Sequence, residues 1–364
     1  TIRISRNLYK NKFVFLTVYK KCALIRLVDS SKTSGRRLLA PQPEGVYSYC
    51  VYIPKLVVRR NNNVYEVVIC HCHGEKIIIV DIDKIKKNIF FRSQDAIDNY
   101  EDFSWHTKNN KNTTHQLNSS QAMAIDVFGC LKLSPEKNKI INAFFGLHTI
   151  KEWKIEFEYT NNELLNEIKS TQVDVLLDND KYAIITECKF TESNFGHCSQ
   201  VDKTKSGLSQ CNGNYLKQEN PINKITEKCS LSGKGIKYWD IIEKTLDYQK
   251  NKIYQPCPFK RKFYQWMRNI CFTKAYEDYF NKDAIFCLFY FNDNHFKTAI
   301  NVKEKKPLSG LERKIRNKNI FKYFSYQGFI EKAIEICSAK KEKRVWKELL
   351  TWIKIKGEKV IAAT

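Results

Sequence analysis

Several features that would reveal a chemistry at once are missing from the sequence. No run of about 18 apolar residues occurs, so no membrane-spanning helix is predicted. The first residues do not resemble a secretory signal peptide. No GxSxG motif is present, which argues against serine-hydrolase chemistry of the nucleophile-elbow kind. The 13 cysteines are an odd number and no secretion signal accompanies them, so the sequence favours a cytoplasmic protein with reduced thiols or a metal cluster over a disulfide scaffold.

Acidic residues are scarce relative to basic ones. The 62 Lys and Arg outnumber the 39 Asp and Glu, which leaves a formal net charge of +23 that is spread along the chain. A basic surface gains affinity for phosphates by releasing counterions, so DNA is predicted as the partner. However, a genome biased towards AT-rich codons also enriches Lys, Asn and Ile, and all three are abundant here. The charge alone is therefore weak support for DNA binding.

The length and the apolar content indicate packed domains. A chain of 364 residues with 43% hydrophobic residues allows two or three domains. Strand-like runs separated by turn signals predict a β-rich module, a small barrel or sandwich, over residues 1–85. These runs are 13–19, 47–53, 56–59, 64–70 and 76–82. The string Cys70-His71-Cys72-His73 suggests zinc, but adjacent ligands share one tetrahedral ion poorly, so a structural role is favoured.

The most informative stretch is a predicted β-hairpin. Two apolar runs, 173–177 and 182–185, flank the polar turn Asp178-Asn179-Asp180. In an antiparallel pair the start of the first strand and the end of the second lie side by side. Charged residues occur at both of these ends.

The charged residues are Asp174 in the first strand and Glu187 and Lys189 in the second. Glu187 and Lys189 are two residues apart and leave the same face of their strand, while Cys188 leaves the other face. Such charges most often lie on a solvated surface. Here the strand stays apolar up to Thr186, so the alternation predicts semi-buried positions. Clustered oxygen ligands of this kind suit Mg²⁺ or Mn²⁺.

These residues also carry a resemblance to a known superfamily. Val173-Asp174, followed after twelve intervening residues by Glu187-Cys188-Lys189, resembles the signature of the PD-(D/E)xK nucleases. The chain is similar to a bacterial branch of restriction endonucleases within that superfamily over roughly residues 115–300. The further segments that carry this similarity are Ser119-Ser120-Gln121-Ala122, Gly235-Ile236-Lys237-Tyr238-Trp239-Asp240, Cys257-Pro258-Phe259 and Tyr264-Gln265-Trp266-Met267-Arg268-Asn269.

The resemblance implies roles for the hairpin residues. Asp174 and Glu187 match the superfamily's ligands of one or two Mg²⁺ ions, and the backbone carbonyl of Cys188 would complete that site. Lys189 would orient or help to deprotonate the attacking water and would offset charge on the phosphorane-like transition state. Val173 stands where the superfamily's name has proline, a position that often varies.

The sequence does not decide which residue would be the third acidic ligand of the site. Many members of the superfamily add an acid from the preceding helix, where this chain has Gln121. Its carbonyl oxygen could coordinate the metal or hold a water, or Gln121 could simply complete a helix cap. Glu158 at the end of the preceding strand is the other candidate. Glu156 shares a face with Glu158, so alternation does not choose between them.

The resemblance and the pattern together predict an α/β core of the restriction-endonuclease type, a mixed sheet flanked by helices. Ser119 or Ser120 is expected to cap a helix that runs to about Leu131, and a strand is expected over 284–291. The predicted division of the chain is a β-rich module for DNA recognition at 1–85, a linker at 86–118, the nuclease core at 119–302 and a basic helical part at 303–364.

Four cysteines follow the hairpin, namely Cys198, Cys211, Cys229 and Cys257. Glycine or proline flanks three of them, which marks irregular backbone that can wrap an ion. Some nucleases of the superfamily carry a [4Fe–4S] cluster on four cysteines, and four thiolates also suit Zn²⁺. The spacings are wide and contain no CxxC pair, so small buried residues without a metal are the alternative.

Gln265 and Arg268 lie three residues apart in a long helical pattern over about 259–280, so they share a helix face and are predicted to contact DNA. The basic segment at 340–356 also predicts either DNA-backbone contact or a solvated helix with aromatic core residues.

The sequence thus predicts a Mg²⁺-dependent DNA endonuclease of the restriction type, active as a homodimer if it cuts both strands. The alternatives are a protein that binds nucleic acid on a nuclease fold without cutting, and a repair exonuclease or RNA nuclease.

Overall fold

The computed structural model describes most of the chain from residue 81 onwards and short pieces of the part before it. The longer described ranges are 81–108, 111–167, 170–192, 196–201, 229–246, 264–303 and 315–363. Between them it describes 2–3, 14–18, 25–27, 60–61, 64–65, 204–205, 208–209, 211, 213 and 257. The chain forms two compact units, Thr1–His73 and Gly74–Thr364.

The described part of the first unit consists of short antiparallel strands. They are β1 (Ile2–Arg3), β2 (Val14–Val18) and β3 (Ile25–Leu27) in one sheet, and β4 (Arg60–Asn61) and β5 (Val64–Tyr65) in another. β2 lies within the strand predicted at 13–19, and β5 lies at the start of the strand predicted at 64–70, whose remaining residues are outside the described part. The strands predicted at 47–53 and 56–59, residues 76–80 of the strand predicted at 76–82 and the string Cys70-His71-Cys72-His73 also lie outside the described residues. Ile82 begins a helix, so the predicted strand does not reach that residue.

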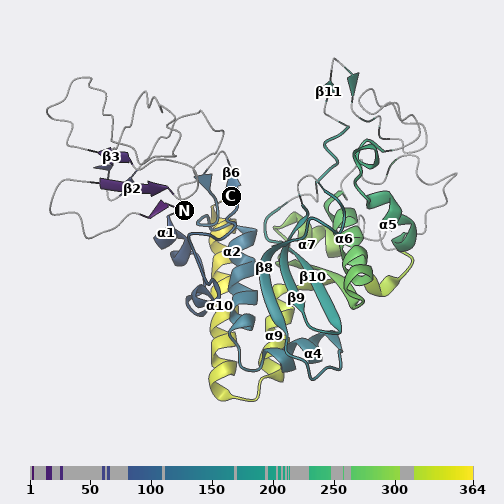
Figure 1. The fold of residues 1–364 in the computed structure, drawn as a ribbon. Coiled ribbons are helices and arrows are strands. Elements are labelled where there is room, and N and C mark those ends of the chain that lie inside the picture. Colours follow the sequence, from purple (N-terminus) through teal and green to yellow (C-terminus); the bar gives the residue numbers. More distant parts are fainter. Residues whose placement is uncertain are drawn as a thin grey trace, which may run out of the picture. The chain divides into compact units, whose positions relative to one another are not determined.

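A mixed five-stranded sheet forms the centre of the second unit (Figure 1), with the order β14-β13-β10-β9-β8. Its strands are β8 (Lys154–Thr160), β9 (Gln172–Asp178), β10 (Tyr182–Lys189), β13 (Asp283–Tyr290) and β14 (Phe321–Ser325). The first three are antiparallel neighbours, whereas β13 runs parallel to both β10 and β14. The predicted strand at 284–291 is confirmed beside the hairpin.

Helices flank this sheet. They are α1 (Ile82–Lys87), α2 (Ser120–Ala124), the π-helix η5 (Ile125–Gly129), α3 (Cys130–Lys132), α4 (Lys137–Phe145), α5 (Tyr238–Thr245), α6 (Tyr264–Phe280), α7 (Lys297–Lys303), α9 (Tyr326–Ile336) and α10 (Lys340–Ala362). Short 3-10 helices occupy Phe91–Ala96 (η4), Ser232–Lys234 (η6) and Lys318–Ile320 (η8). Two-residue strands pair as β6 (Thr107–Lys108) with β7 (Lys111–Asn112) and as β11 (Thr204–Lys205) with β12 (Leu208–Ser209). Among the described helices, none has the length and apolar character that crossing a membrane requires.

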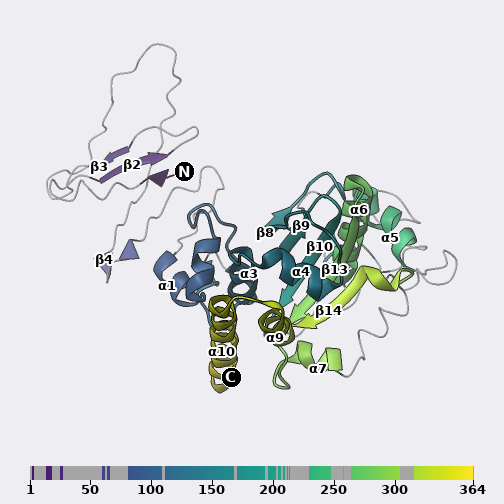
Figure 2. The same cartoon turned by 90° about the horizontal axis from the view of Figure 1, so that it is seen from below.

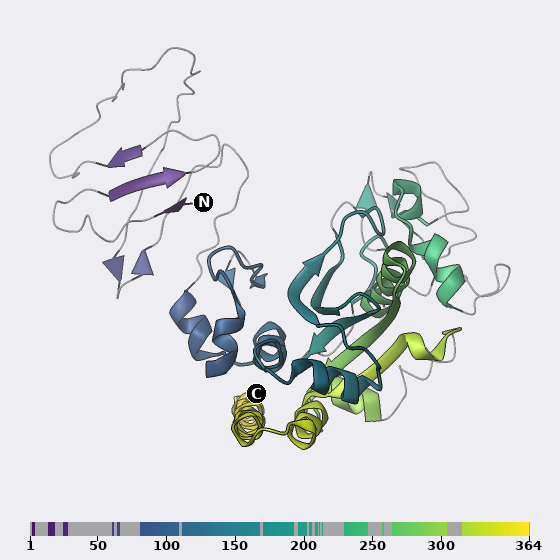
Figure 3. The same ribbon diagram turned by 60° about the horizontal axis from the view of Figure 1, so that its bottom comes forward.

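The helices form a layer on each face of the sheet, which makes the unit compatible with an α/β nuclease-like core. Helices α5 and α6 cover one face, and α2, α4, α9 and α10 lie on the other (Figures 2 and 3). Alternating residues of β10 follow this division, because Ile185 packs with α6 and Ile184 packs with α9 and α10. The chain after residue 302 supplies the edge strand β14 and the helices α9 and α10 to the same unit. The residue boundaries predicted for the domains stay predictions.

Local polar contacts explain where the hairpin turns. The side-chain oxygen of buried Asn179 accepts hydrogen bonds from the backbone N–H groups of Lys181 and Tyr182, as is typical of an Asx turn. Asp178 forms an ion pair with Lys282 at 2.7 Å and accepts a hydrogen bond from Tyr276 on α6. The turn is therefore fixed at the end of the sheet opposite to the charged residues.

The helix predicted from Ser119 is confirmed, with one irregular turn. The Ser119 hydroxyl accepts a hydrogen bond from the N–H of Ala122, and helical structure continues through α2, η5 and α3 to Lys132. The π turn contains Asp126, a carboxylate with no solvent exposure. Single π turns inside α-helices occur frequently at functional sites.

Asp126 forms an ion pair with Lys356 of α10, and 2.5 Å separate the Lys356 Nζ from the Asp126 Oδ2. Lys356 also donates to the carbonyl of Asn88, and Asp126 accepts from the N–H of Phe90 and from the indole of Trp352. Burial raises the pKa of Asp126, and the Lys356 ammonium opposes that rise. This pair joins the helix before the sheet to the last helix of the chain.

Removal of the Lys356 ammonium should destabilise the protein strongly, because it leaves the Asp126 carboxylate buried without its cation. We expect Lys356→Met to lower the free energy of unfolding by about 3–5 kcal/mol in urea titrations. The exposed Lys354 on the same helix gives the control, since Lys354→Met should change stability by less than about 0.5 kcal/mol. Adding Asp126→Asn to Lys356→Met should restore part of the loss; a further loss would contradict the pairing.

Candidate functional site

The charged residues of the hairpin lie side by side. The β9–β10 ladder pairs Ala183 with Asp178 and ends at Thr186 opposite Val175. The next position of the same register sets Glu187 opposite Asp174. The predicted juxtaposition of these two acids is therefore what the antiparallel register produces.

Glu187 and Lys189 share the face of β10 that is covered by α6, and Cys188 faces the opposite layer. Glu187 and Lys189 are only 2% and 6% exposed, so they are more deeply buried than the sequence pattern alone indicates. The Lys189 ammonium lies 2.7 Å from a Glu187 oxygen. Cys188 packs in the core that also contains Tyr326 of α9.

Helix α6 supplies two amides to this pair. Gln265 accepts a hydrogen bond from Lys189 at 3.0 Å and donates one to Glu187, and Asn269 donates to the second Glu187 oxygen at 2.7 Å. The structure brings Gln265, which was predicted to contact DNA, to these two charged residues, and the contact with DNA stays a prediction. Asn269 is a site residue that the sequence analysis missed, although its position four residues after Gln265 on one helix face was a usable signal.

An irregular backbone conformation at Glu158 directs its side chain into the site. Glu158 lies opposite Asp174 in the β8–β9 register but has a φ of +53°, in the left-handed region that non-glycine residues rarely adopt. The alternation of buried residues reverses there, because Phe157 and Val175 face one layer and Tyr159 and Val173 face the other. The kink leaves Glu158 only 8% exposed, whereas Glu156 is exposed.

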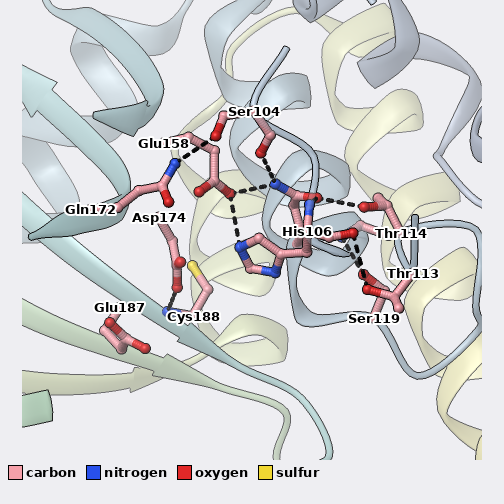
Figure 4. A network of polar contacts seen from close by, with 12 residues as sticks. Ser104, His106, Thr113, Thr114, Ser119, Glu158, Gln172, Asp174, Glu187 and Cys188 are labelled. Atoms are coloured by element: carbon pink, nitrogen blue, oxygen red, sulfur yellow. Dashed lines mark hydrogen bonds and ion pairs between the residues drawn. The ribbon is translucent and has the colours of Figure 1, made fainter. Parts of the chain in front are cut away.

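Gln121 of α2 holds Glu158 in place, and Figure 4 shows Glu158 facing His106. The Gln121 amide nitrogen donates to Glu158 at 2.6 Å and to the carbonyl of Ser104 at 2.9 Å. Its oxygen accepts from the backbone N–H of His106 at 2.8 Å and from the Thr114 hydroxyl at 2.5 Å. Gln121 therefore supports Glu158 and His106 in this structure. The helix is capped by Ser119 and not by Gln121, and a role of Gln121 at the metal stays a prediction.

His106 is the second site residue that the sequence analysis missed. It precedes β6 in a polar stretch that was predicted as a linker, and no local pattern sets it apart. Its Nε2 lies 3.4 Å from Glu158. Burial lowers the pKa of His106, but the hydrogen bond with Glu158 and the charges of Glu158, Asp174 and Glu187 outweigh it and raise that pKa to about 9.

Asp174 lies between the other carboxylates. Its Oδ2 accepts a hydrogen bond from the backbone N–H of Cys188 at 2.6 Å. Burial and the negative charges of Glu187 and Glu158 raise its pKa well above the ordinary value, against the opposing effect of Lys189 and His106. Burial and the two neighbouring acids together thus outweigh the two cations at Asp174.

The arrangement is suited to a metal ion. One ligand atom each of His106, Glu158 and Asp174 lies within 4.8 Å of the others. The N–H of Cys188 points towards Asp174, and because the N–H and C=O of one strand residue point to the same side, the Cys188 carbonyl faces Asp174 as well. Carboxylate and carbonyl oxygens are the ligands that Mg²⁺ and Mn²⁺ prefer.

Other predicted site residues lie outside this group. The Arg268 guanidinium lies over the ring of Tyr264, 5.8 Å from its centroid, and its buried Nε has no hydrogen-bond partner among the residues that the structure describes. Residues Cys198, Cys211, Cys229 and Cys257 are all buried. The N–H of Cys257 donates to the carbonyl of Gly213, which brings that cysteine's backbone beside the segment of Cys211. Among the described residues, these sulfurs are not part of a group whose ligand atoms come within 4.8 Å.

Comparison with known proteins relates the chain to a family of restriction endonucleases. A family model described as "Restriction Endonuclease associating with ARP" matches residues 53–351, which is most of the chain. Neither the curated proteins nor the solved structures contain a match.

The crowding of carboxylates has a measurable consequence for stability. Because the pKa of Asp174 is raised on folding, the folded state holds a proton that the unfolded state releases, and stability falls as the pH rises above the ordinary Asp value. Asp174→Asn removes this penalty. In the presence of a chelator at pH 8 we expect the variant to be more stable than the wild type by about 1–2 kcal/mol, and the difference should shrink towards pH 5.

Urea titrations at both pH values measure this difference. Glu156→Gln, which changes an exposed carboxylate in the neighbouring strand, is the matched control and should be neutral at either pH. A loss of stability in Asp174→Asn at pH 8 would show that the carboxylates do not repel each other in the folded protein.

Proposed function

The chain belongs to the family of restriction endonucleases associating with ARP, and we propose that it is a Mg²⁺-dependent DNA endonuclease that hydrolyses phosphodiester bonds. The observation that supports this most is the convergence of Asp174, Glu187 and Lys189 at one end of a buried strand pair. The family's description also leads us to propose ARP as a protein partner.

In this proposal Asp174, Glu187 and the carbonyl of Cys188 hold the metal ion. The residues fit a divalent cation, because the pKa of Asp174 is raised by neighbouring carboxylates that a cation would neutralise. When bound, Mg²⁺ lowers the pKa of a coordinated water and offsets the charge of the scissile phosphate. Gln265 and Asn269 orient Glu187 from the other side, as outer partners of metal ligands commonly do.

Lys189 is proposed to act as an ammonium ion. Burial lowers its pKa, but the carboxylates of Glu187, Glu192 and Asp174 raise it by more, so the charged form is favoured in the protein without metal. A buried ammonium beside the reacting phosphate would stabilise the negative charge that develops in the transition state and would orient the attacking water. This favours charge stabilisation over proton abstraction among the roles that the sequence left open.

Contacts to DNA are proposed for Arg268. Its guanidinium is held by the Tyr264 ring on the helix that also carries Gln265, and its buried Nε has no hydrogen-bond partner. Guanidinium groups bind phosphate oxygens with parallel N–H donors, so a backbone phosphate of the substrate would satisfy this group. Gln265 acts on Glu187 in this proposal, and a contact between Gln265 and DNA is not required.

We also propose target recognition by the β-rich module at residues 1–85 and, for cleavage of both strands, a homodimer with one site per strand. The basic excess of the chain is consistent with binding along a DNA backbone.

A Mg²⁺-dependent cleavage assay on plasmid DNA tests the activity. We expect nicked and linear products from circular DNA with Mg²⁺ and none with a chelator. Lys189→Ala should lower the rate by about 10²–10³-fold, because a preorganised charge at the transition state is lost. Lys181→Ala, which removes an exposed lysine from the turn of the same hairpin, should cleave as the wild type does.

The same assay separates the other nuclease types. Cleavage restricted to linear DNA would indicate an exonuclease, and cleavage of RNA alone would replace the DNA substrate. Wild-type activity in Lys189→Ala, or full activity without a divalent ion, would contradict the mechanism. Methylated and unmethylated plasmids run in parallel show whether base modification controls cutting.

The four cysteines remain a separate proposal, a [4Fe–4S] cluster or Zn²⁺ on Cys198, Cys211, Cys229 and Cys257. Cys198, Cys229 and Cys257 are buried in one hydrophobic core. The hydrogen bond from Cys257 to Gly213 brings Cys257 beside the segment of Cys211, which is consistent with a shared site. Zinc–sulfur bonds of about 2.3 Å would draw the sulfurs to about 3.8 Å apart. A four-iron cluster spaces its thiolates more widely, so we favour iron–sulfur.

Absorption spectra and metal analysis of anaerobically purified protein test the cluster. We expect a brown protein with a broad visible band and about four iron atoms per chain, and loss of both in Cys257→Ser. Cys271→Ser, which alters a cysteine buried inside α6, is the control and should keep the band. A colourless protein without iron or zinc would overturn this proposal and leave the nuclease proposal standing.

A further inference from the structure

We infer that a groove between α10 and the segment of α1 and η4 binds a single-stranded stretch of DNA. An unpaired base would stack on Phe91, and lysines of both walls would hold the neighbouring phosphates. The inference rests on the proposed function in one respect, since DNA is the proposed substrate. The groove shares no residue with the cluster around Asp174, so it would be a second contact with that substrate.

Two walls that are far apart in the sequence form the groove. Lys86 and Lys87 of α1 and Phe91 of η4 line one wall, and Trp352 and Ile355 of α10 line the other. Helix α1 lies beside α10 in both views of the ribbon (Figures 1 and 2). The groove has a volume of about 330 Å³, within the range of about 300–1,000 Å³ that is typical of sites for small ligands.

Buried polar contacts fix the two walls. Lys356 of α10 donates to the carbonyl of Asn88, which directly follows α1. The Trp352 indole and the backbone N–H of Phe90 both donate to the carboxylate of Asp126. Because these contacts already hold both walls, little conformational entropy is lost when a ligand enters the groove.

Two large apolar side chains are exposed on the walls. Phe91 is 60% exposed and Ile355 is 43% exposed, while Trp352 is half-buried. The buried ring of Phe90 packs against Phe91 with 4.5 Å between their centroids, and against Trp352 with 6.3 Å. Phe91 is thus supported from inside the protein and presents apolar surface to solvent. Exposed apolar surface beside a groove is typical of a binding site.

The charges around the groove indicate an anionic ligand. Lys86 and Lys87 are exposed on one wall and Lys354 is exposed on the helix of the other. Among the described residues, Lys87 and Lys354 have no ion-pair or hydrogen-bond partner. Glu348 is the acid that lines the groove, and it pairs with Arg344 at 2.8 Å. The groove therefore keeps an excess of positive charge that a polyanion would complement.

An aromatic side chain between lysines is typical of sites for single-stranded nucleic acid. Exposed rings stack on unpaired bases of any sequence, and basic residues along the groove bind the phosphates. A phosphate precedes and follows each base, so one base on Phe91 brings negative charge to both walls. The bases of a duplex are already stacked on each other and leave no free face for Phe91. The groove thus fits a single strand better than a duplex.

One helical stretch connects the groove to the catalytic corner. Asp126, which contacts Trp352, and Gln121, which contacts Glu158, are five residues apart on α2 and η5. That spacing is about 7 Å along the helix axis. A strand in the groove would therefore continue towards the site at Asp174, and we expect the preferred substrate to have an unpaired stretch near the cut.

Fluorescence anisotropy with a labelled oligothymidine of about 20 nucleotides tests this on the full chain, in a chelator so that no strand is cut. Phe91→Ala should weaken binding by at least about fivefold, because one stacked base is lost. Phe91→Trp keeps an aromatic face and should bind at least as tightly as the wild type. Tyr279→Ala removes an exposed aromatic side chain of α6 and should bind as the wild type does.

The dependence of affinity on salt tests the lysines. Lys87→Ala and Lys354→Ala should each lower the slope of log K against log salt concentration by about 0.7, because each removes one phosphate contact with a single strand. Phe91→Ala removes no charge and should keep the slope. Lys181→Ala, which removes an exposed lysine from the hairpin turn, should keep both slope and affinity.

Three results would overturn the inference. They are failure of the wild type to bind the oligothymidine, wild-type affinity in Phe91→Ala, and an equal loss for the oligothymidine and for a duplex of the same length. Polyglutamate that binds in a Phe91-dependent way and excludes the oligothymidine would also overturn it and assign the groove to an acidic protein segment. Phe91-dependent binding of the oligothymidine by a protein that never cleaves DNA would retain the groove and refute the proposed function instead.

Discussion

The site depends on the confinement of like charges. Glu158 and Glu187 are buried and Asp174 is half-buried between them at one corner of the sheet. Burial, together with the negative charges of the other two acids, raises the pKa of Asp174. Lys189 and His106 offset part of this charge. Such an arrangement is unfavourable in itself and is maintained only because the rest of the fold holds the carboxylates in place.

The fold holds them from both faces of the sheet. Helix α2 presents Gln121 to Glu158 on one side, while α6 presents Gln265 and Asn269 to Glu187 on the other. The register of the hairpin fixes Asp174 between them. The buried pair of Asp126 and α10 stabilises the helix that carries Gln121, so a contact far from the site in sequence supports its geometry.

How much of this could be predicted differs from part to part. The hairpin, its turn and the shared face of Glu187 and Lys189 follow from strand alternation, because regular strands obey it. The same rule could not choose between Glu156 and Glu158, since the left-handed backbone at Glu158 breaks the alternation at that residue. His106 could not be found at all, because it reaches the site through tertiary contacts made by a polar stretch without periodicity.

The helices show the same contrast. The start at Ser119 was predictable from the chemistry of its cap, whereas the π turn at Asp126 reflects a partner 230 residues further along the chain. Gln265 was recognised from its motif and predicted to contact DNA, which stays a prediction. Its contacts with Glu187 and Lys189 were not predicted, because the sequence gives no indication that α6 lies across β10. Membership in a restriction endonuclease family agrees with the interpretation of the hairpin as the centre of a nuclease.

The central claim is that these confined carboxylates exist to bind a divalent metal. Anomalous diffraction from crystals of the full chain grown with Mn²⁺ tests it most directly. We expect anomalous density beside Asp174, in contact with Glu187 or with Glu158 and His106, while Gln121 and Gln265 keep their hydrogen bonds to the ligands. Crystals of protein active in Mn²⁺ that show no anomalous density near Asp174 would contradict it.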